Sequence, residues 1–148
     1  MLSIETLLEK GKTIAQIIQL AMTRKVDHNL ISIGIKEFDK AMDGGLREGE
    51  LVIVSGETGQ GKTLFCQTLT CNLSKQKIPT LWFSYEVMDY YLADKFKKMG
   101  QTYKDPIYSP IDLVDGTLEF IEKEIKEAIN DEWIGCRVVF IDHLHYLI

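Results

Sequence analysis

The sequence predicts an α/β fold in which a mainly parallel sheet lies between two layers of helices. Short apolar, β-rich runs alternate with amphipathic helical stretches along the chain. Such alternation requires right-handed crossovers, which place helices on both faces of a parallel sheet. The composition agrees, because 148 residues with 45% apolar and 26% charged side chains suit one globular domain. It excludes a collagen, a disordered tail and a disulfide scaffold.

Each predicted strand is an apolar run too short for a buried helix and bounded by polar or glycine-rich sequence. The predicted strands are 51–55, 80–84, 107–109 (the weakest) and 137–142. The predicted helices between and before them are 36–42, 62–74, 87–99 and 117–130. We expect strand 80–84 to lie beside strand 51–55 in the sheet. In the last helix an apolar stripe at helical spacing faces the core, and the acidic residues face water.

The N-terminal segment predicts two helical pieces separated at Gly11. Thr13 and Gln16 have the spacing of a capping box that starts the second piece. An apolar stripe follows at helical period: Ile14, Ile17, Ile18 and Ala21. The sequence leaves open whether this stripe packs on its own domain or on a neighbouring molecule. We therefore divide the chain into a helical linker segment, 1–28, and a core, 29–148.

The net charge of −5 is concentrated in one segment. Eight acids and two bases lie between Asp112 and Glu132, and the rest of the chain is nearly neutral. A nearly neutral body carries no broad basic surface for nucleic acid, although a local basic patch is compatible with this composition.

The three cysteines show no C-x-x-C pair, so they predict reduced thiols that fill the core. No apolar run reaches the roughly 18 residues of a membrane span. Glu5 and Glu9 stand where a signal peptide carries bases. We therefore expect no membrane partner, and a location in the cytoplasm or, for a viral protein, in the interior of the host cell.

A glycine-rich segment after the first predicted strand has the pattern G-x-x-x-x-G-K-[ST] and opens the following helix. Its residues are Gly56, Glu57, Thr58, Gly59, Gln60, Gly61, Lys62 and Thr63. Glycines let the backbone turn its N–H groups toward phosphate oxygens, and the helix N-terminus adds partial positive charge. Lys62 is placed to reach the β- and γ-phosphates, and the Thr63 hydroxyl to ligate Mg²⁺. The pattern predicts a nucleotide site that binds ATP with Mg²⁺.

Asp142 ends the last predicted strand and is the candidate for a second magnesium residue. A carboxylate at this edge of a parallel sheet can hold the metal's hydration shell. The alternative is a purely structural aspartate that caps a turn. Asp94 and Asp105 are weaker candidates because neither ends an apolar run.

Hydrolysis also requires a group that activates or orients water. Glu86 follows strand 80–84 and is expected over the carboxyl edge of the sheet, where ligands bind. The alternative is a glutamate favoured only by a helix N-terminus. Glu57, inside the glycine-rich loop, ranks second because its side chain can point to solvent.

His143 and His145 follow Asp142 closely. Together the three side chains have a spacing compatible with zinc, but no other His or Cys cluster supports a metal centre. We favour His145 as a neutral group that donates a hydrogen bond to the γ-phosphate, the alternative being an ordinary hydrogen-bonded histidine at a strand end.

The order of these motifs resembles the RecA-like P-loop ATPases, and within them the DnaB family of hexameric replicative helicases, including phage-type and Twinkle-like members. Residues 44–51 are similar to the segment that leads into the P-loop in that family, and 80–87 to its strand-plus-glutamate motif. Residues 107–109 with 115–117 resemble the short strand and helix start before its Walker B strand. Residues 141–145 fall on its aspartate-x-x-glutamine pattern, with histidine in place of the glutamine.

This resemblance implies ATP hydrolysis with Glu86 as the catalytic glutamate and His145 in the γ-phosphate-sensing position. It also implies single-stranded DNA and a hexameric ring of identical subunits as partners. In that family further strands, DNA-contacting loops and an arginine finger follow the Walker B strand, so we expect this chain to be truncated at its C-terminus. RadA-like and KaiC-like ATPases share the lead-in and the glutamate, and they remain an alternative, as does a nucleotide-binding fragment without turnover.

Overall fold

The computed structural model describes residues 13–23, 30–110, 113, 116–132 and 134–143. The helices are α2 (Ile14–Thr23), α3 (Lys36–Ala41), α4 (Lys62–Lys75), α5 (Asp89–Lys98) and α6 (Leu118–Asn130). The strands are β1 (Thr80–Ser84), β2 (Ile107–Tyr108) and β3 (Val138–Asp142). Within these ranges no helix combines the length and apolar character that a bilayer crossing requires.

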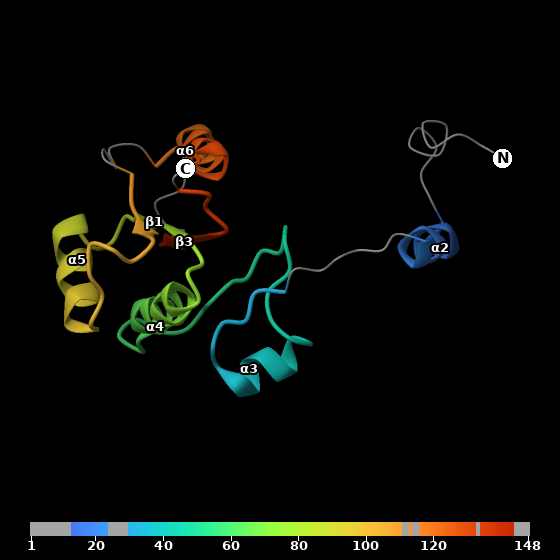
Figure 1. Cartoon of the computed structure of the whole chain (residues 1–148), viewed down its shortest axis with the longest axis horizontal. Helices are drawn as coiled ribbons and strands as arrows, with labels where there is room; N and C mark the ends of the chain where they lie inside the picture. The colour runs from blue at the N-terminus through green and yellow to red at the C-terminus, as the bar shows by residue number, and fades with distance from the viewer. Residues whose placement is uncertain (1–12, 24–29, 111–112, 114–115, 133, 144–148) are drawn as a thin grey trace.

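The three strands form a parallel sheet in the order β2-β1-β3, which confirms the predicted α/β class. Side chains of β1 alternate between its two faces. Leu81 and Phe83 pack with α6 on one face, while Trp82 packs with α4 and α5 on the other. The strands therefore lie between two helical layers, α6 on one side and α4 with α5 on the other (Figure 1).

Helix α6 forms where its amphipathic pattern predicts, but the two ends of its apolar stripe, Leu118 and Ile129, are exposed because they lie beyond the part of the helix that packs on the sheet. The Thr117 hydroxyl caps it by accepting a hydrogen bond from the backbone N–H of Phe120. Ile121 and Ala128 are buried against the sheet, in one cluster with Cys136. The three cysteines carry free thiols, as predicted.

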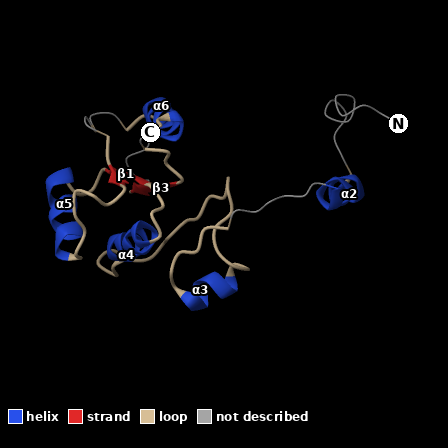
Figure 2. Ribbon diagram, viewed as in Figure 1, coloured by secondary structure: helices blue, strands red, loops and turns tan. Residues whose placement is uncertain are grey.

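The prediction of a buried strand at 51–55 is wrong. This stretch is a continuous loop (Figure 2), and the side chains of Leu51 and Ile53 are 87% and 66% exposed. The expected pairing with β1 is wrong as well, because β2 and β3 occupy both sides of β1. A strand needs a partner for its backbone N–H and C=O groups. No strand in the described part of the chain supplies one to this run, although its sequence is β-rich.

The segment before this loop is held on α4 by hydrogen bonds from two amide side chains. Asn72 Nδ2 donates to the carbonyl of Ile33 at 3.1 Å, and Gln76 Nε2 donates to that of Ser32 at 2.9 Å. Ile31 forms an antiparallel bridge with Leu46. Gly45 fits closely against this bridge, since a Cβ on it would lie 2.3 Å from the carbonyl oxygen of Ile31. The glycine is therefore required by space as well as by its φ of +134°.

The predicted capping box at the start of α2 is present. Gln16 accepts from the backbone N–H of Thr13 at 2.9 Å, and the Thr13 hydroxyl accepts from that of Gln16 at 3.3 Å. The helix lies apart from the others (Figure 1), and Ile14 is 72% exposed. The first helical piece that we predicted, before Gly11, lies outside the described residues.

Candidate nucleotide site

The glycine-rich loop adopts the backbone conformation for which its glycines suit it. Gly59 and Gly61 have φ values of +83° and +85°, in the left-handed region that other residues avoid. Gly61 is also the N-cap residue of α4, with no side-chain cap. The first backbone N–H groups of α4 are therefore available to an anion, in the direction favoured by the helix dipole.

Lys62 is folded back into the loop that it follows. Its Nζ donates to the backbone carbonyls of Gly56 and Glu57, each at 2.9 Å. These bonds fix the ammonium inside the cradle, and an ammonium has three donors. One donor remains for a phosphate oxygen, so the position agrees with the predicted role.

Thr63 and Asp142, 79 residues apart in the sequence, are joined by a hydrogen bond. The Thr63 hydroxyl at the start of α4 donates to Asp142 Oδ2 at the end of β3, at a distance of 2.8 Å. A hydroxyl and a carboxylate are hard oxygen ligands, the type that Mg²⁺ prefers. The two residues predicted to hold magnesium are thus in direct contact beside the phosphate loop, and their donor set fits that ion.

Glu86 lies at the same edge of the sheet. Its backbone N–H donates to the carbonyl of Asp142 at 3.4 Å, and the N–H of Tyr85 donates to the same carbonyl at 2.7 Å. The side chain of Glu86 is exposed. Its place follows from the pairing of β1 with β3 rather than from the expected pairing of β1 with 51–55.

The weaker carboxylate candidates are engaged elsewhere. Asp94 pairs with Lys98 on α5 at 2.6 Å. Asp105 accepts from Ser74 in the last turns of α4, far along the helix from Thr63. Within the glycine-rich loop, Gln60 Nε2 lies 3.5 Å from an exposed Glu57 carboxylate oxygen.

The predictions that involve histidine are only partly covered by the structure, because His145 lies outside the described residues. Among the residues that are described, no group of three His, Cys, Asp or Glu side chains is arranged to hold a metal ion.

Sequence reasoning missed that the buried side of α4 carries a row of polar residues beside its apolar ones. Gln67, Thr70 and Ser74 are all buried there, following Thr63 at helical spacing. Thr70 accepts a hydrogen bond from Trp82 Nε1 at 2.9 Å. The sequence does contain a sign of this row, because spacings of three and four residues place Thr63 and the three buried polar side chains on one face of the helix.

Cys66 lies on the same helix, near the residues predicted to hold magnesium. Burial, and next the negative charge of Asp142, raise the pKa of its thiol to about 11. The thiol is therefore protonated at neutral pH, which agrees with the prediction of a packing role.

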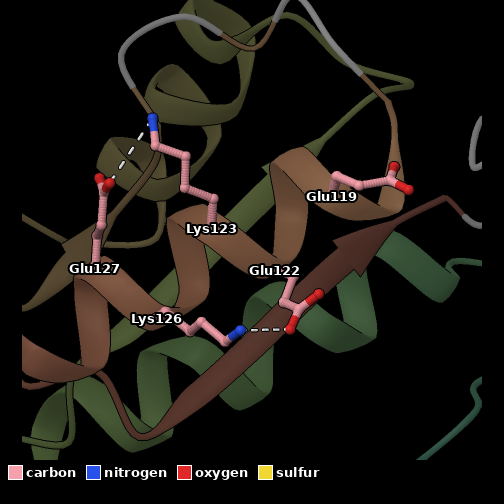
Figure 3. Close-up of a pocket in the computed structure, with 5 residues that line it drawn as sticks. All are labelled: Glu119, Glu122, Lys123, Lys126 and Glu127. Carbon is pink, nitrogen blue, oxygen red and sulfur yellow. Dashed lines mark hydrogen bonds and ion pairs between the residues drawn. The ribbon is translucent and has the colours of Figure 1, made fainter.

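A shallow hollow on the outer side of α6 offers no comparable chemistry. Charged side chains line it: Glu119, Glu122, Lys123, Lys126 and Glu127. Figure 3 shows Lys126 paired with Glu122 and Lys123 with Glu127, across successive turns. The hollow is on the layer opposite the glycine-rich loop, and salt bridges within one helix explain its composition.

Residues 31–147 match the family model described as "ATPase: KaiC". The chain belongs to the KaiC family of ATPases. This membership confirms the RecA-like P-loop class that the motifs predicted, while the narrower likeness to DnaB helicases stays a prediction.

Curated relatives of this KaiC-family chain include proteins named for DNA repair and replication. It is 26% identical to the DNA repair protein RadA of Aquifex aeolicus over 68% of its own length and 22% of the relative's. It is 37% identical to the DNA repair protein RadA of Escherichia coli over 47% of its length and 15% of the relative's. It is 34% identical to a probable replicative DNA helicase of Trieres chinensis over 43% of its length and 14% of the relative's. The chain thus spans less than a quarter of the length of these relatives.

Proposed function

We propose that this chain is the nucleotide-binding core of an ATPase that acts on DNA. The observation that carries the proposal is the hydrogen bond between Thr63 and Asp142, beside a loop into which Lys62 is folded. This arrangement supplies a cradle for phosphates and two oxygen ligands for Mg²⁺. Bound Mg²⁺ would neutralise charge on the β- and γ-phosphates, while the backbone and Lys62 hold them.

Nucleotide binding is tested by titrating ATPγS into the protein with and without Mg²⁺. Lys62→Ala removes the ammonium from the cradle and is expected to weaken binding by about 10²-fold. Lys75→Ala is the matched control, because Lys75 is an exposed lysine in the last turn of the same helix. Equal affinity of both variants and the unaltered protein would refute the site.

We further propose that the protein hydrolyses ATP with Glu86 orienting the attacking water. Its position beside Asp142, at the carboxyl edge of β1 and β3, supports this role. Glu86→Gln is expected to lower turnover by about 10²- to 10⁴-fold and to leave ATPγS affinity unchanged. Glu57→Gln, in the second-ranked carboxylate, is the control and should keep turnover. The reverse result would assign the role to Glu57.

The proposed action on DNA rests on the names of the relatives. A DnaB-like helicase would be a hexameric ring that translocates on single-stranded DNA and unwinds duplexes. The second candidate, a RadA-like recombination ATPase, is favoured by the 37% identity to a RadA protein over 70 residues. ATP-dependent strand displacement on forked DNA separates them, because only the helicase releases the labelled strand. DNA-stimulated turnover without displacement would favour the RadA-like function.

His145 is proposed as the group that senses the γ-phosphate. If it acts by donating a hydrogen bond, His145→Gln should retain turnover, since an amide also donates. His145→Ala should lose turnover while keeping its affinity for ADP. Equal turnover of all three proteins would contradict the sensing role.

A further inference from the structure

A second tie connects α4 to the sheet, two helical turns beyond the bond between Thr63 and Asp142. It is centred on Trp82 in β1, whose side chain is fully buried. Trp82 Nε1 donates to the hydroxyl of Thr70 at 2.9 Å. That hydroxyl in turn donates to the backbone carbonyl of Cys66 at 2.9 Å. Thr70 thus links the side chain of Trp82 in β1 to the backbone of the helix that carries Thr63.

The same indole contacts the strand that carries Asp142. Trp82 stacks on Phe140 with ring centroids 4.9 Å apart and an angle of 16° between the ring planes. The two residues are also register partners in the pairing of β1 with β3. Phe140 and Asp142 are two residues apart, so they point to the same face of the sheet. Trp82 therefore lies between the helix with one magnesium residue and the strand with the other.

We propose that Trp82 and Thr70 are positioning residues that hold Thr63 and Asp142 at the separation required to share one Mg²⁺. The inference rests on the proposed nucleotide site. Thr70 is about 10 Å from Thr63 along the helix axis, and Phe140 is about 7 Å from Asp142 along the strand. Apolar contacts of α4 have no preferred direction, and the bond from Ser74 to Asp105 lies further along the helix from Thr63 than Thr70 does. A second attachment at Thr70 fixes both the position and the rotation of the helix.

The central pair of variants separates the hydroxyl of Thr70 from its methyl group. Thr70→Val keeps the branched shape but removes the acceptor for Trp82, whereas Thr70→Ser keeps the acceptor. Trp82→Phe keeps an aromatic ring for Phe140 and removes the N–H. Ile121→Val is the control for lost stability, because Ile121 is buried on the opposite face of the sheet.

The first measurement is the affinity for ATPγS with and without Mg²⁺. Mg²⁺ is expected to raise the affinity for ATPγS about tenfold less in Thr70→Val and Trp82→Phe than in the unaltered protein. The affinity measured without Mg²⁺ should change little. Thr70→Ser and Ile121→Val should keep the full gain. A merely structural role would lower the stability of these proteins without separating the two affinities.

The second measurement contains no nucleotide. Thr63→Val removes the bond to Asp142, and its effect on the denaturation midpoint is compared in two backgrounds. In the Thr70→Val background we expect the loss caused by Thr63→Val to fall by about half, because the two ties are coupled. In the Ile121→Val background the loss should be unchanged.

These results separate the positioning role from the nucleotide site. If Lys62→Ala weakens nucleotide binding but Thr70→Val keeps the full gain from Mg²⁺, the positioning role is overturned and the site stands. If neither the variants nor the addition of Mg²⁺ changes nucleotide binding, the proposed site fails. The comparison of denaturation midpoints without nucleotide then decides the positioning role alone. If the effects of Thr63→Val and Thr70→Val on the midpoint are additive, the positioning role is overturned. If the effect of one depends on the other, the role is supported.

Discussion

Both helical layers make apolar contacts with the sheet, but only one of them adds a series of side-chain hydrogen bonds. On one face, Ile121 and Ala128 of α6 pack on Leu81 and Phe83 of β1 in a wholly apolar cluster. On the other face, the buried side of α4 combines apolar residues with a row of polar side chains, and this polar face adds side-chain hydrogen bonds to the apolar contacts. The hydrogen bonds join Thr63 to Asp142, Thr70 to Trp82 and Ser74 to Asp105.

This difference matters because the two contacts constrain a helix differently. Apolar burial stabilises in proportion to the area removed from water and has no preferred direction. Hydrogen bonds require a narrow range of distance and angle, so several of them fix the axial position and rotation of a helix. The candidate nucleotide site lies at the start of the hydrogen-bonded helix, where its ligands must meet within tenths of an ångström.

The apolar layer should therefore contribute more to stability than to function. Ile121→Ala removes a buried side chain from the α6 cluster and is expected to lower the free energy of unfolding by roughly 2–5 kcal/mol. Leu118→Ala, at a position of the same helix that is 62% exposed, is the control and should cost far less. Urea unfolding measures both. A loss of nucleotide affinity in Ile121→Ala at temperatures where it stays folded would break the distinction between the layers.

One member of the polar face is expected to weaken the protein. Gln67 is buried on α4, and its Nε2 has no hydrogen-bond partner. Gln67→Met fills a similar volume without an unpaired donor, so we expect a gain of about 1 kcal/mol in the free energy of unfolding. Gln67→Glu, which would bury a charge, should lose stability in the same urea experiment. A loss in both variants would show that the amide is satisfied in solution.

The sequence predicted the apolar layer better than the polar one. The bounds of α6 and its stripe through Ile121 follow from local periodicity, which a single helix contains in full. The pairing of Thr70 with Trp82 joins residues 12 apart on different elements, and no periodicity within either element reveals it. The run 51–55 failed for a related reason, because a β-rich sequence becomes a strand only beside a partner. The contact between Thr63 and Asp142 could be predicted because the P-loop motif and a strand end mark these residues, while the roles of Lys62 and Glu86 stay predictions.

A smaller effect is expected at the end of the polar face, where Asp105 meets Ser74. Hydrogen bonds from the backbone N–H of Thr102 first, and from the Thr102 and Ser74 hydroxyls, lower the pKa of Asp105 from its usual 3.8. A lowered pKa means that the contribution is present above pH 3.8 and is lost as pH falls through the folded value. Asp105→Asn should therefore flatten the acid side of the curve of stability against pH.

The control for Asp105 is Asp94→Asn, which changes a surface carboxylate paired with Lys98 on α5. Thermal midpoints between pH 2 and 7 distinguish the two variants. The same acid limb in Asp105→Asn and in the unaltered protein would mean that the hydrogen bonds of Asp105 add nothing to folding, and that Ser74 does not help to attach α4.

The smallest effect is expected on the outer side of α6, where Lys126 pairs with Glu122 (Figure 3). The hydrogen bond and charge of Lys126 lower the pKa of Glu122, so any contribution is present above the usual value of 4.5 and is lost below the folded one. Both side chains are about two-thirds exposed, at 68% and 65%, and water screens their attraction. Glu122→Gln should leave the thermal midpoint unchanged at low salt and in 1 M salt. A fall in the thermal midpoint of Glu122→Gln as large as that of Ile121→Val would mean that the charged outer side also stabilises α6. The two layers would then no longer differ as the buried contacts imply.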